Sequence, residues 1–594
     1  MYSRIMHLSS RWAMVSLLCA VPFAKAGDVR VVEAAKDRNP TALAALVKQH
    51  ADVNVPLPDG ATALHWAAYW DDAAMVDVLI RAGARVNAAN EDGATPLYLA
   101  CINRNAAIVE KLLVAGANVN AELPSGESAL MTAARTGSPD VAHVLLAHGA
   151  NVNAKEKTHG QTALMWAVAY DHADVAKVLL DADASTSARD DVRHRSVNTG
   201  FTISERKSGV PLDTELGGFT PLMFAARNGD VELGKRLLAA GANVNDVAAN
   251  GASALALATH SGNGPFATFL LEHGADPNAA GAGFAPLHAA VLRGDLPLIK
   301  ELLARGADPN VELVKGTGTR YSSSDYHLNG AFIGATPYWL AAKYGEPEIM
   351  RVLVAHGADP KHLAKDGSSA ILAAVTAKTP GQLGYIVDRR DRTDTPTEFA
   401  ARPAGQDERT TFEVVEQACK DGIDPNRVAN MGGRSSVRGS GAGGAGDANT
   451  ANAGGAAAAG NGAAAGNGAA AGNGGNAGNG GGGRGGNGGS TPLMEAALRG
   501  YTSVVKLLLD DGADVNGASQ SGDTALHVAA QGGYDDVIRL LVARGANLDA
   551  KNRKGLTPMS TLSVKSAAQY IGQIVPEEKL KAAREALVQL GAKE

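Results

Sequence analysis

Three histidines occupy the same place in similar stretches of the chain, where they could act as metal ligands or general bases: His65, His288 and His527. A neutral imidazole binds zinc and titrates near physiological pH, so both roles are chemically open. In other copies of the stretch this position holds tyrosine or methionine, namely Tyr98, Met131, Met165, Met223 and Met494. A ladder of metal sites would not tolerate thioethers so freely. We therefore expect structural histidines and predict no metal and no cofactor.

The other residues capable of chemistry also indicate structural roles. His148, His273 and His356 each come just before the expected end of a helix, where imidazole can hydrogen-bond the last carbonyl groups. Cys101 and Cys419 lie in widely separated copies without a thiolate-stabilising neighbour, so we expect buried thiols and no disulfide. The sequence has no HExxH, P-loop, GxSxG or Rossmann motif. We predict that the protein is not an enzyme and has no catalytic residues.

The composition is that of a soluble globular protein. The 594 residues are 45% hydrophobic and 20% charged, with a formal net charge of −6. A broad nucleic-acid-binding surface would require clustered lysine and arginine, which this balance does not supply. We therefore expect no nucleic-acid partner.

The first 26 residues have the features of a cleavable signal peptide. Arg4 and Arg11 give a basic start, and residues 12–23 form an apolar run too short to span a membrane comfortably. Residues 24–26, Ala-Lys-Ala, fit a small-x-small cleavage site. A buried N-terminal helix or an uncleaved anchor is the alternative. We expect cleavage near Ala26, and a mature protein in the periplasm or outside the cell with no membrane segment.

The stretch 523–555 indicates how each copy folds. Thr524 can cap a helix with its hydroxyl, Leu526 and two alanines follow at helical spacing, and Gly533 supplies the left-handed residue that ends this helix. A second helix carries an apolar stripe that includes Leu541, and a polar finger loop follows it. One such helix pair cannot bury its own apolar face, but stacked copies can.

This pattern of Thr-(Pro/Ala)-Leu-His-x-Ala-Ala, then Gly, then Leu-Leu, then Gly-Ala, resembles the ankyrin repeat. Copies begin at 61, 94, 127, 161, 219, 252, 284, 335, 368, 490 and 523, of which the copy at 368 is degenerate. The resemblance implies an all-α ankyrin-repeat solenoid of about 12 helix-turn-helix repeats, in which the histidines bond to threonine and loop backbone. Polar, atypical stretches at 28–60 and 556–594 are expected to cap the array. The chain is also similar to exported, periplasmic ankyrin proteins of bacteria.

Four insertions interrupt the expected array. Residues 185–218 and 311–334 lengthen two finger loops, and alternating stretches at 200–209 and 319–328 predict small hairpins within them. Residues 379–409 split a repeat, whose second helix we expect within 410–426.

The fourth insertion, residues 431–489, is rich in Gly, Ala and Asn without apolar periodicity, which predicts a flexible loop. The predicted segments are therefore a signal peptide at 1–26, repeats at 27–430, the flexible loop at 431–489, and C-terminal repeats with a capping helix at 490–594.

Stacked repeats form a long concave groove. By resemblance, ankyrin arrays recognise proteins with variable residues at the end of the first helix of each repeat. Tyr, Trp and Arg dominate interface energetics, although exposed variable positions are also compatible with ordinary surface. We predict a monomeric, non-enzymatic scaffold that binds another protein, and expect these partner-binding residues: Tyr69, Trp70, Asn103, Arg135, Tyr170, Arg227, Arg293, Tyr344 and Arg499.

Two alternatives stay open at the level of sequence. A ligand-binding or enzymatic site could lie in the insertions 185–218 and 311–334, and polar clustering between two folded loops would favour it. The second alternative is that the protein is secreted into a host and binds host proteins, which a lack of retention in the periplasm would favour.

Overall fold

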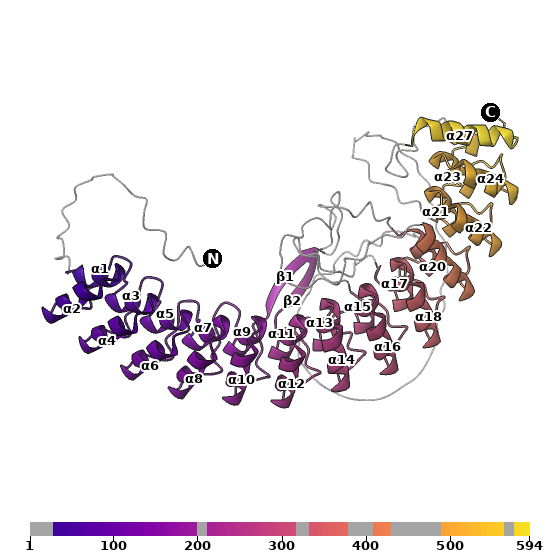
Figure 1. Ribbon diagram of the computed structural model, residues 1–594. Coiled ribbons are helices and arrows are strands. Elements are labelled where there is room, and N and C mark those ends of the chain that lie inside the picture. The colour runs from indigo at the N-terminus through magenta and orange to yellow at the C-terminus, as the bar shows by residue number, and fades with distance from the viewer. Residues whose placement is uncertain are drawn as a thin grey trace, which may run out of the picture. The chain divides into compact units, whose positions relative to one another are not determined.

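The computed structural model describes residues 28–198, 211–315, 332–377, 408–428, 489–562 and 575–593. The chain divides into two compact units, Met1–Ala331 and Phe332–Glu594. Within each unit, helix pairs stack so that first helices form one row and second helices another (Figure 1). The all-α repeat architecture predicted from the sequence is confirmed. The predicted signal peptide and residues 431–488 lie outside the described residues, so those predictions stand as predictions.

The first unit contains eight helix pairs among its described residues. Its first helices pack on one another in order: α1 (Arg30–Lys36), α3 (Ala63–Tyr69), α5 (Pro96–Ile102), α7 (Ala129–Thr136), α9 (Ala163–Ala169), α11 (Pro221–Asn228), α13 (Ala254–Ser261) and α15 (Pro286–Arg293). Its second helices form the other row: α2 (Pro40–Lys48), α4 (Ala73–Arg81), α6 (Ala106–Val114), α8 (Pro139–Ala147), α10 (Ala173–Asp181), α12 (Val231–Ala239), α14 (Gly264–Glu272) and α16 (Leu296–Ala304).

The second unit repeats this arrangement. Its first helices are α17 (Pro337–Tyr344), α19 (Ala370–Val375), α21 (Pro492–Arg499), α23 (Ala525–Gly532) and the short α25 (Pro558–Thr561). Its second helices are α18 (Pro347–Ala355), α20 (Glu408–Lys420), α22 (Thr502–Asp510), α24 (Asp535–Ala543) and the longer α27 (Glu577–Gln589). The charged helix α27 packs on α23 and α24, so it closes the array as the polar C-terminal sequence predicts.

Small side chains allow neighbouring helices to approach closely. Leu64, Ala67 and Ala68 on α3 are completely buried, and Val76 and Leu79 on α4 face them from the same repeat. Burying one leucine side chain contributes about 2 kcal/mol. Because the same positions recur along the chain, the core is one continuous layer within each unit rather than a set of separate cores.

Asparagines tie each finger loop to the next repeat. Asn54 donates from Nδ2 to the carbonyl oxygen of Gly83 at 3.1 Å and accepts from the backbone nitrogen of Arg85 at 2.7 Å. The same pair of hydrogen bonds recurs at Asn87, Asn120, Asn245, Asn278 and Asn516. In the second unit, Asn426 makes both bonds to the turn after α22. The repeats on either side of residues 429–488 are therefore direct neighbours in the stack.

The repeated histidine is structural, as the resemblance implies. His65 Nδ1 accepts from the backbone nitrogen of Thr62 at 3.0 Å, and Nε2 lies 3.0 Å from the carbonyl oxygen of Ala94 in the next repeat. Since a carbonyl can only accept, Nε2 carries the proton. His527 makes the equivalent contacts to Thr524 and Leu556. In the repeat of α17, the residue that bridges to the next repeat is Trp339, which donates to the carbonyl oxygen of Ser368 at 3.2 Å.

These histidines should make stability fall as the pH drops. Burial lowers the pKa of His65 and of His527 below the ordinary value of about 6.5. The folded state then binds fewer protons than the unfolded state, so their contribution is present above pH 6.5 and is lost as the pH falls below it. We expect the free energy of unfolding to fall as the pH drops from 6.5 to 5.5, by up to about 1.4 kcal/mol per pH unit for each histidine, and the thermal midpoint to fall with it. His65→Gln with His527→Gln should flatten this dependence, and an unchanged dependence would contradict the assignment.

The histidines at the ends of second helices divide into two groups. His273 and His356 contact the carbonyl oxygens of Phe269 and Val352 through Nδ1, both at 2.8 Å, as predicted. His148 instead places its Nε2 3.0 Å from a carboxylate oxygen of Glu110 in the preceding repeat, so no bond to a helix carbonyl is seen for it, and its expected interaction with the helix dipole stays a prediction. A nearby carboxylate is a stronger acceptor than a carbonyl oxygen that already serves the helix.

Four first helices in the first unit are followed by a residue other than glycine with positive φ, the first being Arg38 after α1, with φ of 55°. Asp71, Arg104 and Asp171 have φ of 59°, 61° and 61°, in the place where α7 is followed by Gly137. A side chain in this left-handed region costs about 1 kcal/mol. Arg104→Gly is therefore expected to raise the free energy of unfolding by about 0.5 kcal/mol. This is less than the strain it relieves, because glycine also gives the unfolded chain more conformational freedom. In urea denaturation, the control Arg85→Gly should instead destabilise; equal effects would refute the strain argument.

The insertion 185–218 contains a hairpin whose two strands lie on either side of the predicted stretch. Strands β1 (Arg193–Asn198) and β2 (Pro211–Leu216) are antiparallel, with Arg193 opposite Leu216. Residues 200–209, where the sequence predicts alternation, lie outside the described residues. The base is pinned by Arg189, which donates to the carbonyl oxygens of Gly218 and Val247 at 2.9 and 2.6 Å. In the insertion 311–334, residues 316–331 lie outside the described residues, so a site between the two loops stays a hypothesis.

Candidate functional site

Two aromatic side chains stay exposed at the ends of first helices in the first unit. Tyr69 ends α3 and is 37% exposed, and Tyr170 follows α9 and is 54% exposed. Among the described residues these are the two aromatic side chains that remain exposed to this extent. Both were predicted as partner-binding residues, and the structure places both at the edge of the row of first helices.

Tyr69 belongs to an aromatic cluster with Trp66 and Trp70. The rings of Tyr69 and Trp70 are 4.8 Å apart and edge-on, and those of Trp66 and Trp70 are stacked 6.0 Å apart. The cations of Lys36 and Arg38 lie over Trp66 and Trp70, at 5.5 and 5.3 Å from the ring centres. Trp70 also donates from Nε1 to the carbonyl oxygen of Lys36 at 3.1 Å, so it is half-buried and held in place.

Several predicted site residues instead fasten one repeat to the preceding one. Asn103 donates from Nδ2 to the carbonyl oxygens of Ala68 and Tyr69 at 2.9 and 2.8 Å. Arg293 donates from Nε to the carbonyl oxygen of His260 at 3.0 Å. These carbonyls lie in the last turn of first helices, where helix carbonyls lack the usual partner four residues on. Asn103 and Arg293 therefore cap the neighbouring helix, which is a role in stacking.

The remaining predicted residues have different surroundings. Arg499 donates to a carboxylate oxygen of Glu495 at 2.6 Å within α21. The side chain of Tyr344 is half-buried, and this burial raises the pKa of its hydroxyl. Arg227 at the end of α11 is exposed and has further contacts within the chain. The nine residues thus lie in both units, and they do not form one continuous patch.

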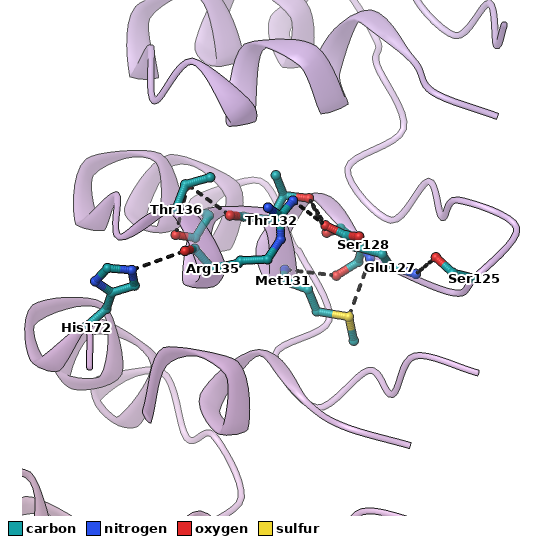
Figure 2. A network of polar contacts seen from close by, with 9 residues as sticks. Ser125, Glu127, Ser128, Met131, Thr132, Arg135, Thr136 and His172 are labelled. Carbon is teal, nitrogen blue, oxygen red and sulfur yellow. Dashed lines mark hydrogen bonds and ion pairs between the residues drawn. The ribbon is translucent and has the colours of Figure 1, made fainter. Parts of the chain in front are cut away.

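Arg135 lies in a polar network that sequence reasoning missed. Its Nη2 is 2.9 Å from Oε1 of Glu127, and the two side chains are only 15% and 14% exposed. The hydroxyl of Thr132 donates to the same carboxylate oxygen at 3.0 Å, and Tyr98 from the preceding repeat also bonds this carboxylate. Figure 2 shows Arg135 reaching back along α7 toward Glu127. The nearest sequence signal is a charged residue directly before the cap Ser128, where most copies have alanine or another uncharged residue.

Burial controls the electrostatics of this network. Burial raises the pKa of the Glu127 carboxyl and outweighs the hydrogen bonds from Thr132 and Tyr98, which favour its ionised form. Burial likewise lowers the pKa of Arg135. The guanidinium also lies 5.9 Å from the ring centre of Trp166 in the next repeat. In the repeat of α7, Arg135 is therefore occupied by an internal ion pair with Glu127, whereas the rings of Tyr69 and Tyr170 are exposed.

Among the residues that the structure describes, no group of three His, Cys, Asp or Glu side chains is placed to hold a metal ion. None of the helices described is long and apolar enough to cross a bilayer. Burial raises the pKa of both Cys101 and Cys419, so neither thiol is activated as a thiolate.

Comparison with known proteins identifies the family. The ankyrin-repeat model, which describes three copies at a time, matches residues 31–122, 105–190, 222–313, 287–386 and 469–552. These matches cover well over half of the chain, so the chain belongs to the ankyrin-repeat family. The crystal structure of the human ASB11 ankyrin repeat domain is 29% identical, with a TM-score of 0.34, and the match covers 42% of this chain and 98% of that one.

Ankyrin repeats are protein-interaction modules, and proteins of this family are generally not enzymes. The fold therefore defines the class of the protein as a protein-binding scaffold.

Proposed function

We propose that this chain is an exported, non-enzymatic scaffold that binds a partner protein with the ends of its first helices, in the periplasm or outside the cell. The observation that carries the binding site is the exposure of Tyr69 and Tyr170, at 37% and 54%, at the ends of two first helices. Exposed aromatic side chains are the residues most enriched among the energetic anchors of interfaces.

Contacts within the array divide the nine expected residues by role. Tyr69, Trp70, Tyr170 and Arg227 are assigned to partner contact because they form an exposed or half-exposed edge in the first unit. Five others are assigned to stacking or to internal bonds, on the evidence of their contacts and burial: Asn103, Arg135, Arg293, Tyr344 and Arg499. The sequence features of residues 1–26 support export.

Crosslinking in native cells tests the binding proposal. A tagged full-length chain should capture a specific protein, and Tyr69→Ala with Tyr170→Ala should weaken the purified complex by about thirtyfold. The matched control is Val114→Ala, which changes an exposed apolar residue, 72% exposed, on the second helix α6. A complex that is indifferent to the tyrosine changes would refute the site.

Fractionation and N-terminal sequencing test export. The mature protein should begin near Gly27 and leave the cell interior, and Leu17→Asp with Leu18→Asp should retain it. A full-length chain that begins at Met1 in the cell interior would contradict the proposal.

A further inference from the structure

The first three finger loops of the array carry only negative charge. Residues 54–61, 87–94 and 120–127 contain no lysine or arginine, and they expose the carboxylates of Asp59, Glu91, Asp92 and Glu122. The fourth finger reverses this pattern with Lys155 and Lys157, and the latter pairs with Glu122 at 3.1 Å. The acidic stretch is therefore local to three consecutive repeats.

Backbone contacts hold these acidic fingers side by side. The backbone nitrogen of Glu91 donates to the carbonyl oxygen of Asp59 at 2.9 Å. Between the next two fingers, Gly93 lies against the ring of Pro124, where even a Cβ would be only 2.7 Å from Cδ. The exposed carboxylates thus form a continuous ridge rather than isolated charges.

The aromatic cluster lies on a helix that begins at this ridge. Asp59 is three residues before the cap Thr62 of α3, and Trp66, Tyr69 and Trp70 occupy the rest of that seven-residue helix and its end. Such a helix is about 10 Å long. Carboxylates and aromatic faces are consequently within reach of one bound segment. Both groups attract cations, and the rings of Trp66 and Trp70 already have Lys36 and Arg38 over them.

Trp66 has a buried donor that a ligand could satisfy, a feature that Trp166 shares at the equivalent position of a later repeat. The side chain of Trp66 is only 7% exposed, and its indole nitrogen is buried without any hydrogen-bond acceptor. An unsatisfied buried donor is unfavourable. The exposed Lys36 covers this ring, so a segment that displaces Lys36 could supply both a replacement cation and a backbone carbonyl as the acceptor.

We propose that this acidic-aromatic face, formed by Asp59, Glu91, Asp92 and Glu122 on the fingers and Trp66, Tyr69 and Trp70 on α3, binds an extended basic segment of the partner protein. The inference rests on the proposed function, since it names the chemistry of what the first unit binds. Three cations of the chain already contact this face, Lys36 and Arg38 over the tryptophan rings and Lys157 beside Glu122, so a basic segment would compete with them. Arg135 is neutralised by Glu127, and Arg104 stands alone at the helix end between Trp70 and Arg135.

Fluorescence anisotropy with defined peptides tests this inference on the full-length chain. The probe is a fluorescein-labelled peptide of alternating arginine and serine, compared with a counterpart that has glutamate in place of arginine. The arginine peptide should bind, more weakly as salt is raised, and the glutamate peptide should not. Removing the finger charges with Asp59→Asn, Glu91→Gln, Asp92→Asn and Glu122→Gln should weaken binding by about tenfold.

A charge-matched variant provides the control. Asp140→Asn, Asp174→Asn, Asp181→Asn and Glu272→Gln remove the same number of exposed carboxylates from second helices, and should leave the affinity unchanged. Equal weakening by both variants would overturn the inference, because attraction would then be general. If the crosslinked natural partner depends on Tyr69 and Tyr170 but ignores the finger variant, the binding proposal stands and the basic segment is refuted.

Discussion

Replacing Glu127 with alanine is expected to lower the free energy of unfolding of the first unit by about 3 kcal/mol. The change leaves the guanidinium of Arg135 mostly buried without its carboxylate, and breaking one side of a buried ion pair is strongly destabilising. It also removes the acceptor for Thr132 and Tyr98. Hydrogen exchange of α5, α7 and α9 under native conditions would measure the loss where it occurs.

Two further variants separate the buried charge from ordinary packing. Glu127→Gln keeps an acceptor and the shape of the side chain, so it should cost less than alanine. Glu127→Met combined with Arg135→Leu removes both charges, and should recover most of the stability. If Glu127→Ala changes the exchange of these helices no more than an exposed control such as Glu91→Ala, then the ion pair has no role in holding these repeats together.

Truncating Tyr338 to alanine is expected to cost about 4 kcal/mol in the second unit. Tyr338 is 1% exposed and stands on α17 where most copies have leucine. Its hydroxyl donates to Oδ2 of Asp421 at 2.6 Å, and Gln417 donates to the other oxygen of the same carboxylate at 2.9 Å. Burial and this bond raise the pKa of Tyr338. The contact ties the end of α20 to the preceding repeat.

The hydrogen bond between Tyr338 and Asp421 helps to hold the second helix of the split repeat in place. Helix α20 follows α19 only after residues 378–407, which are not described, yet it packs on α19, α18 and α22 as a normal second helix does. Tyr338→Phe removes only the hydroxyl and should cost about 1.5 kcal/mol. Urea denaturation of both variants, with Tyr344→Phe as a control, would measure the difference. A Tyr338→Phe protein as stable as the parent would show that α20 is held by apolar packing alone.

Helix positions were predictable because local chemistry fixes them. Threonine or serine precedes most first helices, as when Thr95 accepts from the backbone nitrogen of Tyr98, and glycine such as Gly533 ends many of them in the left-handed conformation. The helix predicted within 410–426 is α20, which begins two residues earlier. The hairpin expected at 200–209 lies outside the described residues and stays a prediction. The strands β1 and β2 on either side of it were not predicted, since alternation in a short polar stretch does not fix register.

The roles of the helix-end residues were not predictable from one sequence. Asn103 and Tyr69 occupy nearly equivalent positions, but Asn103 is long enough to reach the last carbonyls of the preceding helix whereas Tyr69 packs its ring against Trp70. The difference depends on the neighbouring repeat, which is about 34 residues away in the chain. Glu127 was missed for the same reason, since its partners Tyr98 and Arg135 come from two different repeats.

Hydrogen exchange of the purified complex with the captured partner tests the central claim most directly. The account predicts slower exchange on partner binding at the ends of α3 and α9 and in the fingers 54–61, 87–94 and 120–127. Exchange in the second helices α4, α6, α8 and α10 should not change. Protection confined to those second helices, or to the insertion 185–218, would contradict a binding site at the ends of the first helices.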